Sequence, residues 1–220
     1  MSVADGSAYN CSGKCNRPRT IFSENGMGKG RMEAFSDGVI AILITIMVLE
    51  LKVPHGADFA TLRPLLPIAL AYLLSFTYLG IYWNNHHHML HTVTHISGGI
   101  LWANLHLLFW LSLVPFATGW MGENHFESVP VALYGCIMAM AGVAYYILSQ
   151  TIIASQGPHS LLKVAVGRDW KGQLSNVLNL GAIPLAFWRP WASLVVYVIV
   201  ALVWFVPDRR IERTIQEPHG

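Results

Sequence analysis

The chain has 220 residues, of which 54% are hydrophobic and only 12% are charged, and its mean hydropathy is +0.45. Soluble domains contain roughly 25% charged residues, so this composition predicts an integral membrane protein with the lipid bilayer as its main solvent. The formal net charge of +2 provides no basic field for phosphate groups, which excludes nucleic acid as a partner.

Residues 1–30 mix Gly, Ser, Asn and scattered charges without hydrophobic periodicity. Such a composition cannot bury enough apolar surface to fold, so these residues are predicted to form a disordered tail. Cys11 and Cys15 lie in this tail without the further ligands that a zinc site needs. We interpret them as free thiols.

The first apolar segment, residues 34–53, has the length of a membrane span, because 20 residues reach about 30 Å as a helix. Polar residues at its start allow two interpretations. In the first, Ser36 or Asp37 caps the helix and Arg31 reaches the lipid headgroups. In the second, Asp37 lies within the membrane and has a functional partner. The residues alone leave both interpretations open.

One face of this segment combines three aliphatic side chains and one hydroxyl at helical spacing: Ile42, Thr45, Ile46 and Leu49. If copies of the helix surround a symmetry axis, the aliphatic side chains form hydrophobic rings, which can gate a pore by dewetting. A ring of Thr45 hydroxyls then replaces part of the hydration shell of an ion. The alternative is that Thr45 bonds the carbonyl four residues earlier and packs against a neighbouring helix.

Five more apolar segments follow, at about residues 65–83, 98–120, 129–155, 174–188 and 191–206. Together with the first segment they predict an all-α protein with six transmembrane helices. Pro115 is expected to kink or end the third helix, and Gly181 and Pro184 are expected to break the fifth. A count of five spans, with the last two segments re-entrant, is the alternative.

The distribution of Lys and Arg predicts the orientation in the membrane. Most of the 14 lie in the N-terminal segment, the C-terminal segment and the connection after the fourth span, whereas the opposite loops contain only Lys52, Arg63 and Arg189. The positive-inside rule therefore predicts a multi-pass protein of the cell membrane with both termini in the cytoplasm. The membrane unit is predicted to cover residues 31–210, between the cytoplasmic tails 1–30 and 211–220.

Half of the ten histidines lie in one stretch of the chain, residues 86–95. Successive members of the set His87, His91 and His95 are four residues apart, which can chelate a metal on a helix, but no carboxylate or Cys accompanies them. We favour the interpretation that imidazoles of this cytoplasmic loop pair with Arg31 or Asp37, and such groups can make behaviour pH-dependent. A His-rich metal-binding transporter or enzyme is the alternative function.

Asn104 and His106 are polar residues within the third span, and we expect them to form hydrogen bonds between helices or to be satisfied within the core. The sequence contains no nucleophile–base pair, phosphate loop or dinucleotide fingerprint. The protein is therefore predicted not to be an enzyme and to have no cofactor. The filter sequence of ordinary potassium channels is also absent.

The motif Arg31-x-x-x-Phe35-Ser36-Asp37, which opens the first span, resembles the hallmark of the transmembrane protein 175 family of cation channels. The resemblance covers about residues 30–213, and one six-span unit is similar to the bacterial members. Further similar motifs are Tyr82-Trp83-x-x-His86-His87, Leu101-Trp102-x-Asn104-Leu105, Pro115-Phe116-x-Thr118 and Trp204-Phe205-x-Pro207-Asp208.

This resemblance implies a homotetramer in which four copies of the first helix line a central pore and conduct K⁺ passively with weak selectivity. It implies that Ile42 is the hydrophobic gate, that Thr45 forms a hydroxyl layer tied to selectivity and that Leu49 is an outer constriction. Ile46 is expected to line the same pore. A polar network is expected to hold the first helix in place, and its candidate members are Arg31, Phe35, Ser36, Asp37, Trp83, His86, His87 and Asn104.

Overall fold

The computed structural model describes residues 24–157, 162 and 170–205, and every regular element in this part of the chain is helical. Most of the predicted N-terminal tail and all of the predicted C-terminal tail lie outside the described residues. The elements are α1 (Glu24–Met47), η1 (Val48–Glu50), η2 (Phe59–Leu65), α2 (Leu66–His91), α3 (Gly98–Ser112), α4 (Val114–Glu123), α5 (Ser128–Gln156), α7 (Trp170–Trp188) and α8 (Pro190–Phe205).

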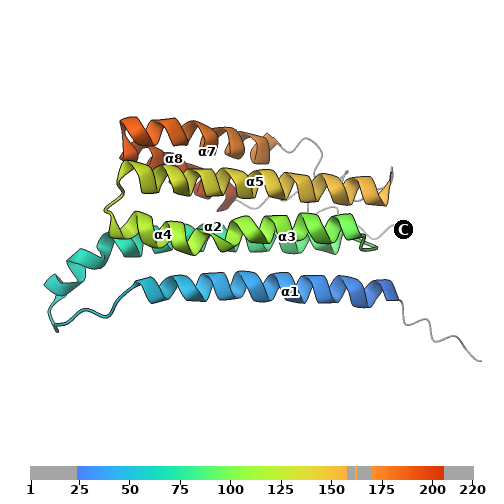
Figure 1. The fold of residues 1–220 in the computed structure, drawn as a ribbon, viewed down its shortest axis with the longest axis horizontal. Helices are drawn as coiled ribbons and strands as arrows, with labels where there is room; N and C mark the ends of the chain where they lie inside the picture. Colours follow the sequence, from blue (N-terminus) through green and yellow to red (C-terminus); the bar gives the residue numbers. More distant parts are fainter. Residues whose placement is uncertain (1–23, 158–161, 163–169, 206–220) are drawn as a thin grey trace, which may run out of the picture.

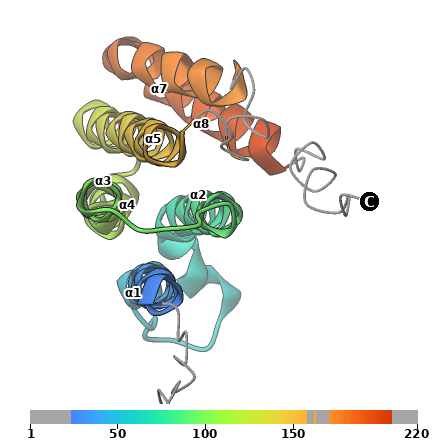
Figure 2. The same cartoon turned by 90° about the vertical axis from the view of Figure 1, so that its right-hand side faces the viewer.

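The long helices run side by side, and α1 forms one edge of the bundle (Figures 1 and 2). α2 and the successive helices α3 and α4 form the next layer, and α5, α7 and α8 lie on the far side of it. α1 packs on α2, α3 and α4, whereas α5 packs chiefly on α3 and α7. The first helix is therefore covered by its own chain on one side only.

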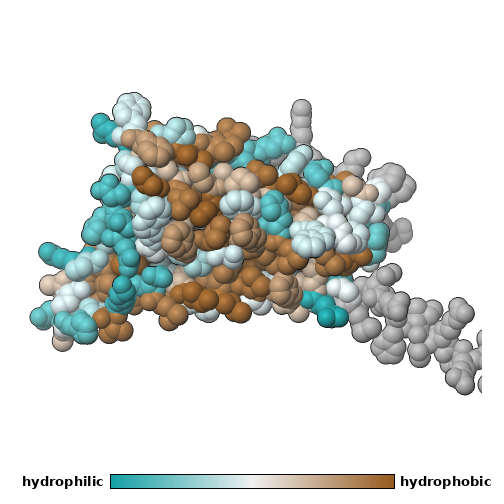
Figure 3. Space-filling model, in the orientation of Figure 1, coloured by the Kyte–Doolittle hydropathy of each residue, from teal (hydrophilic) through white to brown (hydrophobic). Residues whose placement is uncertain are grey.

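Four helical stretches in the described part of the chain are long and apolar enough to cross a membrane: Gly28–Glu50, Phe59–His91, Gly98–Glu123 and Ser128–Gln156. α8 is apolar but shorter. Figure 3 shows hydrophobic residues across the middle of one face and hydrophilic residues gathered at the end of the bundle near the η2 turn. The all-helical membrane architecture predicted from composition is confirmed, while the count of six spans stays a prediction.

Two helix boundaries differ from those expected. α1 begins at Glu24, so the expected boundary of the tail at residue 30 falls inside this helix. α2 continues to His91, so most of the His-rich stretch is helical and does not form the expected loop. The last two turns of α2 carry polar side chains, so a search for apolar segments ends before them. The backbone hydrogen bonds of the helix nevertheless continue through these turns.

Proline acts as expected at one position and not at another. Pro115 stands in the first turn of α4, directly after the break between α3 and α4 at Leu113, where its missing N–H is tolerated. Pro184 and Gly181 lie inside α7, which continues from Trp170 to Trp188, so the expectation that they break this helix was wrong. Packing on α5 and α8 supplies the stability that local propensity lacks.

Buried hydroxyls connect the helices of the inner layers. Ser75 of α2 and Thr118 of α4 have their oxygens 2.6 Å apart, and Ser75 also donates to the hydroxyl of Tyr134 in α5. Tyr78 donates to the carbonyl of Tyr197 in α8 at 2.7 Å. In a bilayer, where packing and hydrogen bonds replace the hydrophobic effect between helices, these contacts determine how α2, α4, α5 and α8 fit together.

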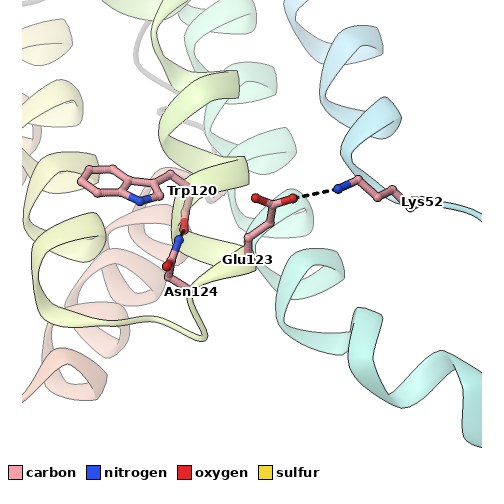
Figure 4. A network of polar contacts seen from close by, with 4 residues as sticks. All are labelled: Lys52, Trp120, Glu123 and Asn124. Atoms are coloured by element: carbon pink, nitrogen blue, oxygen red, sulfur yellow. Dashed lines mark hydrogen bonds and ion pairs between the residues drawn. The ribbon is translucent and has the colours of Figure 1, made fainter.

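At one end of the bundle, an ion pair joins the chain after α1 to the end of α4. The Nζ atom of Lys52 lies 3.1 Å from Oε1 of Glu123, and both side chains are exposed (Figure 4). Next to this pair, Asn124 donates from its side chain to the carbonyl of Trp120 and so closes the last turn of α4. The ion pair connects two segments that are 71 residues apart.

The contact of α4 with α2 yields a prediction. A Cβ atom on Gly122 would lie only 2.8 Å from the Cα of Ile68, so Gly122→Ala forces the two helices apart. We expect it to lower the free energy of unfolding by about 1–3 kcal/mol, measured by thermal unfolding in detergent. Gly181→Ala is the matched control, since a Cβ there meets nothing within 4 Å. Equal unfolding midpoints for the two variants would contradict the close packing.

Candidate functional site

α1 has two faces of different character. Its buried residues recur at intervals of three or four: Met32, Ser36, Ile40, Leu43 and Met47. This is the spacing of one stripe along a helix, and it faces α2, α3 and α4. Ser36 is the one polar member of the stripe. Polar groups buried in a membrane helix need partners, so the anchoring of α1 depends on what Ser36 contacts.

The opposite face of α1 carries the side chains that the sequence assigned to a pore. Ile42 is 56% exposed, Ile46 is 44% exposed and Leu49 is 74% exposed, although all three are large and aliphatic. Thr45 lies between them and is also exposed. The structure thus brings the four residues onto one uncovered stripe, which runs along α1 at Ile42, Thr45 and Ile46 and continues into η1 at Leu49.

The hydroxyl of Thr45 donates to the backbone of its own helix, 3.0 Å from the carbonyl of Ala41 and 2.9 Å from that of Ile42. This is the local bond that the sequence gave as the alternative role for Thr45. Because the proton points into the helix and the side chain is exposed, the oxygen lone pairs remain accessible on the outer face. The bond and a role toward cations are therefore compatible.

On the covered face, three buried side chains form a chain of hydrogen bonds. Ser36 donates to the carbonyl of Met32 at 2.8 Å and accepts from Nδ2 of Asn104 at 2.9 Å. The other amide atom of Asn104, Oδ1, lies 2.7 Å from Nε2 of His86. Each of the three is at most 2% exposed. This chain connects α1, α3 and α2 and satisfies the hydroxyl and the amide in a water-free layer.

A second polar contact lies one residue further along α1. The indole Nε1 of Trp83 donates to Oδ1 of Asp37 at 3.0 Å. From the residues alone we expected an imidazole near Asp37 or Arg31, while the family resemblance also included Trp83 in the polar network. The structure places the indole of Trp83 at Asp37 and directs His86 to Asn104. Arg31 is exposed, and within the described residues it forms no ion pair. Phe35 is 54% exposed and lies outside these contacts.

The remaining histidines form a separate group at the end of α2. The ring of His87 stacks on Trp83, and its Nε2 lies 3.1 Å from Nε2 of His91. His95 follows the helix, where its Nδ1 lies 3.3 Å from the hydroxyl of Thr94. Among the residues that the structure describes, no group of three or more His, Cys, Asp or Glu could hold a metal ion.

The structure adds Glu33 to the residues near this site, which sequence reasoning missed. Its Oε1 atom is buried without a hydrogen-bond partner among the described residues, as is Nδ1 of His86. The available signal was its spacing, since Glu33 stands one turn before Asp37 on the same helix. Glu33 thus adds a second carboxylate, beside that of Asp37, to the polar part of α1.

These features define a class of protein. It is a multi-pass helical membrane protein whose first helix is anchored on one face by buried polar contacts and is uncovered along an apolar face. The family model described as the endosomal/lysosomal potassium channel TMEM175 matches residues 31–115, which include both faces of α1 and the polar contacts.

Full-length similarity extends this match. A potassium channel of Chryseobacterium sp. (strain P1-3) is 53% identical over 191 residues, which are 87% of this chain and 100% of the relative. A potassium channel of Streptomyces collinus is 35% identical over 127 residues, 54% of this chain and 62% of that relative. The chain belongs to the TMEM175 family.

A solved structure agrees with this assignment. The crystal structure of a lysosomal potassium-selective channel TMEM175 homolog from Chamaesiphon minutus is similar to this fold with a TM-score of 0.73 and 28% identity. The similarity covers 82% of this chain and 97% of that one. It therefore includes helices beyond the part that the family model matches.

The buried chain of hydrogen bonds yields a second prediction. Asn104→Ala leaves the groups of Ser36 and His86 that face it unpaired, so it is expected to destabilise the fold by about 1–3 kcal/mol in thermal or denaturant unfolding. The matched control is Asn124→Ala, because the exposed side chain of Asn124 donates to the nearby carbonyl of Trp120 at the end of α4. Its expected effect is within about 0.5 kcal/mol. Equal stability of both variants would show that the buried amide does not anchor α1.

Proposed function

We propose that four copies of this chain assemble into a homotetramer in the cell membrane and that K⁺ passes through a central pore lined by the four α1 helices. Membership of the TMEM175 family supports this function, as do relatives that are named potassium channels. The chain is proposed to contribute six spans, with both termini in the cytoplasm. K⁺ is the permeant ion, and no cofactor takes part.

The observation that carries this proposal is the uncovered stripe on α1. An aliphatic face that is 44–74% exposed at Ile42, Ile46 and Leu49 must be covered by lipid or by other copies of the chain. The oxygen of Thr45 lies on the same stripe, between Ile42 and Leu49. Around a symmetry axis, the same arrangement gives hydrophobic rings on both sides of a ring of oxygen atoms.

Each residue of the stripe has a proposed role. Ile42 forms the narrow gate, because a ring of branched aliphatic side chains expels water and raises the energy of an ion in the pore. Thr45 offers its hydroxyl oxygen to a partly dehydrated K⁺ ion, since its proton is donated to the backbone. Leu49 forms a further constriction about one helical turn away.

The polar contacts of α1 have a positioning role in this proposal. The bonds from Ser36 to Asn104 and from Asp37 to Trp83 determine the rotation of α1 about its own axis. That rotation decides which side chains point at the pore axis. The channel unit is proposed to cover residues 31–210, with residues 1–30 and 211–220 as cytoplasmic tails.

The gate is tested by K⁺ flux into liposomes that contain the purified protein. We expect the parent protein to conduct K⁺ and Ile42→Asn to raise the flux about 10-fold or more, because a polar ring holds water where an aliphatic ring expels it.

Ile199→Asn is the matched control for this experiment, since Ile199 is 48% exposed on α8, away from α1. Its flux is expected to equal that of the parent. If the parent shows no K⁺ flux, or if Ile42→Asn and the parent conduct equally, the assignment of the pore to α1 is wrong.

Selectivity gives a further prediction at Thr45. Thr45→Val keeps the shape of the side chain but removes the oxygen, so the K⁺/Na⁺ permeability ratio is expected to fall toward one by a few fold. Reversal potentials under bi-ionic K⁺/Na⁺ conditions measure this ratio. Thr45→Ser keeps the hydroxyl and is expected to remain close to the parent. A ratio that Val leaves unchanged would remove Thr45 from the selectivity layer.

A further inference from the structure

A cavity of about 400 Å³ lies between α2, α5, α7 and α8, on the side of α2 away from α1. Its volume falls within the roughly 300–1,000 Å³ of small-molecule sites. The walls are formed by Tyr78 and Tyr82 of α2, Val143 of α5, Asn176 and Asn179 of α7 and Trp204 of α8, together with their neighbours. None of its lining residues belongs to α1, so the cavity is separate from the proposed pore.

The lining is aromatic and aliphatic, with a few polar groups. None of the described lining residues is Lys, Arg, His, Asp or Glu, so the cavity does not favour a charged ligand. Several polar side chains are already used within the protein. Tyr78 donates to the carbonyl of Tyr197, and the indole of Trp204 donates to the hydroxyl of Ser175 at 2.7 Å.

Asn179 differs from these side chains. Asn179 is only 4% exposed, yet its Oδ1 atom has no hydrogen-bond partner among the described residues. Asn176 stands one turn earlier on α7 and is packed so closely on Gly142 that a Cβ atom there would collide with its side chain. Both residues line the cavity. An amide oxygen without a hydrogen bond is unfavourable inside an apolar bundle, and a bound group that donates a hydrogen bond to it would remove that cost.

We propose that this cavity binds a neutral single-chain lipid alcohol, such as a monoacylglycerol, with its hydroxyl groups on Asn179 and Asn176. A hydroxyl both donates and accepts, so it can serve the carbonyl and the NH₂ group of an amide together. The acyl chain packs on the tyrosines and Trp204. Water fits less well, because a buried water needs two to four polar partners and most of these walls are apolar.

The position of the cavity is consistent with a ligand from the bilayer. Its α2 and α5 walls belong to helical stretches long and apolar enough to span the membrane. Tyr146 and Val177 line it and are 46% and 65% exposed, so the cavity reaches the surface of the bundle on this side. A lipid can therefore enter laterally without crossing water.

The test uses tryptophan fluorescence of the purified full-length protein in detergent. The probe is a monoacylglycerol whose chain is 9,10-dibromostearoyl, because bromine quenches an indole that it contacts. Quenching is measured against probe concentration for the parent and for Trp204→Phe. The difference between the two quenching curves is the quenching of Trp204, and it reports binding of the probe in the cavity. We expect this difference to saturate. Asn179→Leu is expected to weaken binding about 10-fold, since it removes the hydrogen-bonding group.

Three comparisons make the result decisive. Asn124→Leu lies outside the cavity, and this variant is expected to bind the probe as the parent does. Val143→Phe fills the cavity and is expected to abolish the saturable component. This second variant keeps the test valid if Asn179→Leu fails to fold. Methyl 9,10-dibromostearate, which lacks hydroxyls, is expected to bind about 10-fold more weakly. A difference signal that does not saturate, or equal affinity of the ester and the alcohol, would overturn the proposal.

Discussion

A polar side chain surrounded by hydrocarbon must find its hydrogen-bond partner within the protein, and this constraint organises the attachment of α1. Ser36 has one hydroxyl proton and donates it to its own helix, so it can only accept from Asn104. The amide of Asn104 then has its carbonyl oxygen directed at His86. The direction of each hydrogen bond therefore follows from that of the bond before it. The rotation of α1 against α2 and α3 is therefore fixed by these three side chains together with the apolar residues of the same stripe, such as Ile40 and Met47.

The rest of the bundle divides into two regions around α2. On one side, α1 presents an aliphatic stripe with a single hydroxyl, and this face is the basis of the proposed pore. On the other side, α2, α5, α7 and α8 enclose the cavity, and one of its lining residues is Asn179, whose Oδ1 has no hydrogen-bond partner among the described residues. α2 provides groups to both regions, since Trp83 and His86 face α1 and α3 whereas Tyr78 and Tyr82 line the cavity.

Much of this arrangement could be predicted from the sequence. Composition and segment length indicated a helical membrane protein, and the spacing from Ile42 to Leu49 indicated a single stripe. Two kinds of feature could not be predicted. The resemblance named Trp83 as a member of the polar network, but its pairing with Asp37 could not be singled out, because several neighbouring side chains can bond a carboxylate and only the packing of α2 selects the indole. The continuity of α7 through Pro184 was missed because local propensity does not include the neighbouring helices.

The two attachments of α1 have a mechanical consequence. The bonds at Ser36 and Asp37 hold one part of the helix, and the ion pair of Lys52 with Glu123 holds the chain just beyond its other end. A rod restrained at two supports deflects most between them. The interval between the supports contains Ile42 and Thr45 of α1 and Leu49 of η1. A change in the bundle that shifts either support would therefore bend this interval, and in the proposed pore that bending would change the width at these residues.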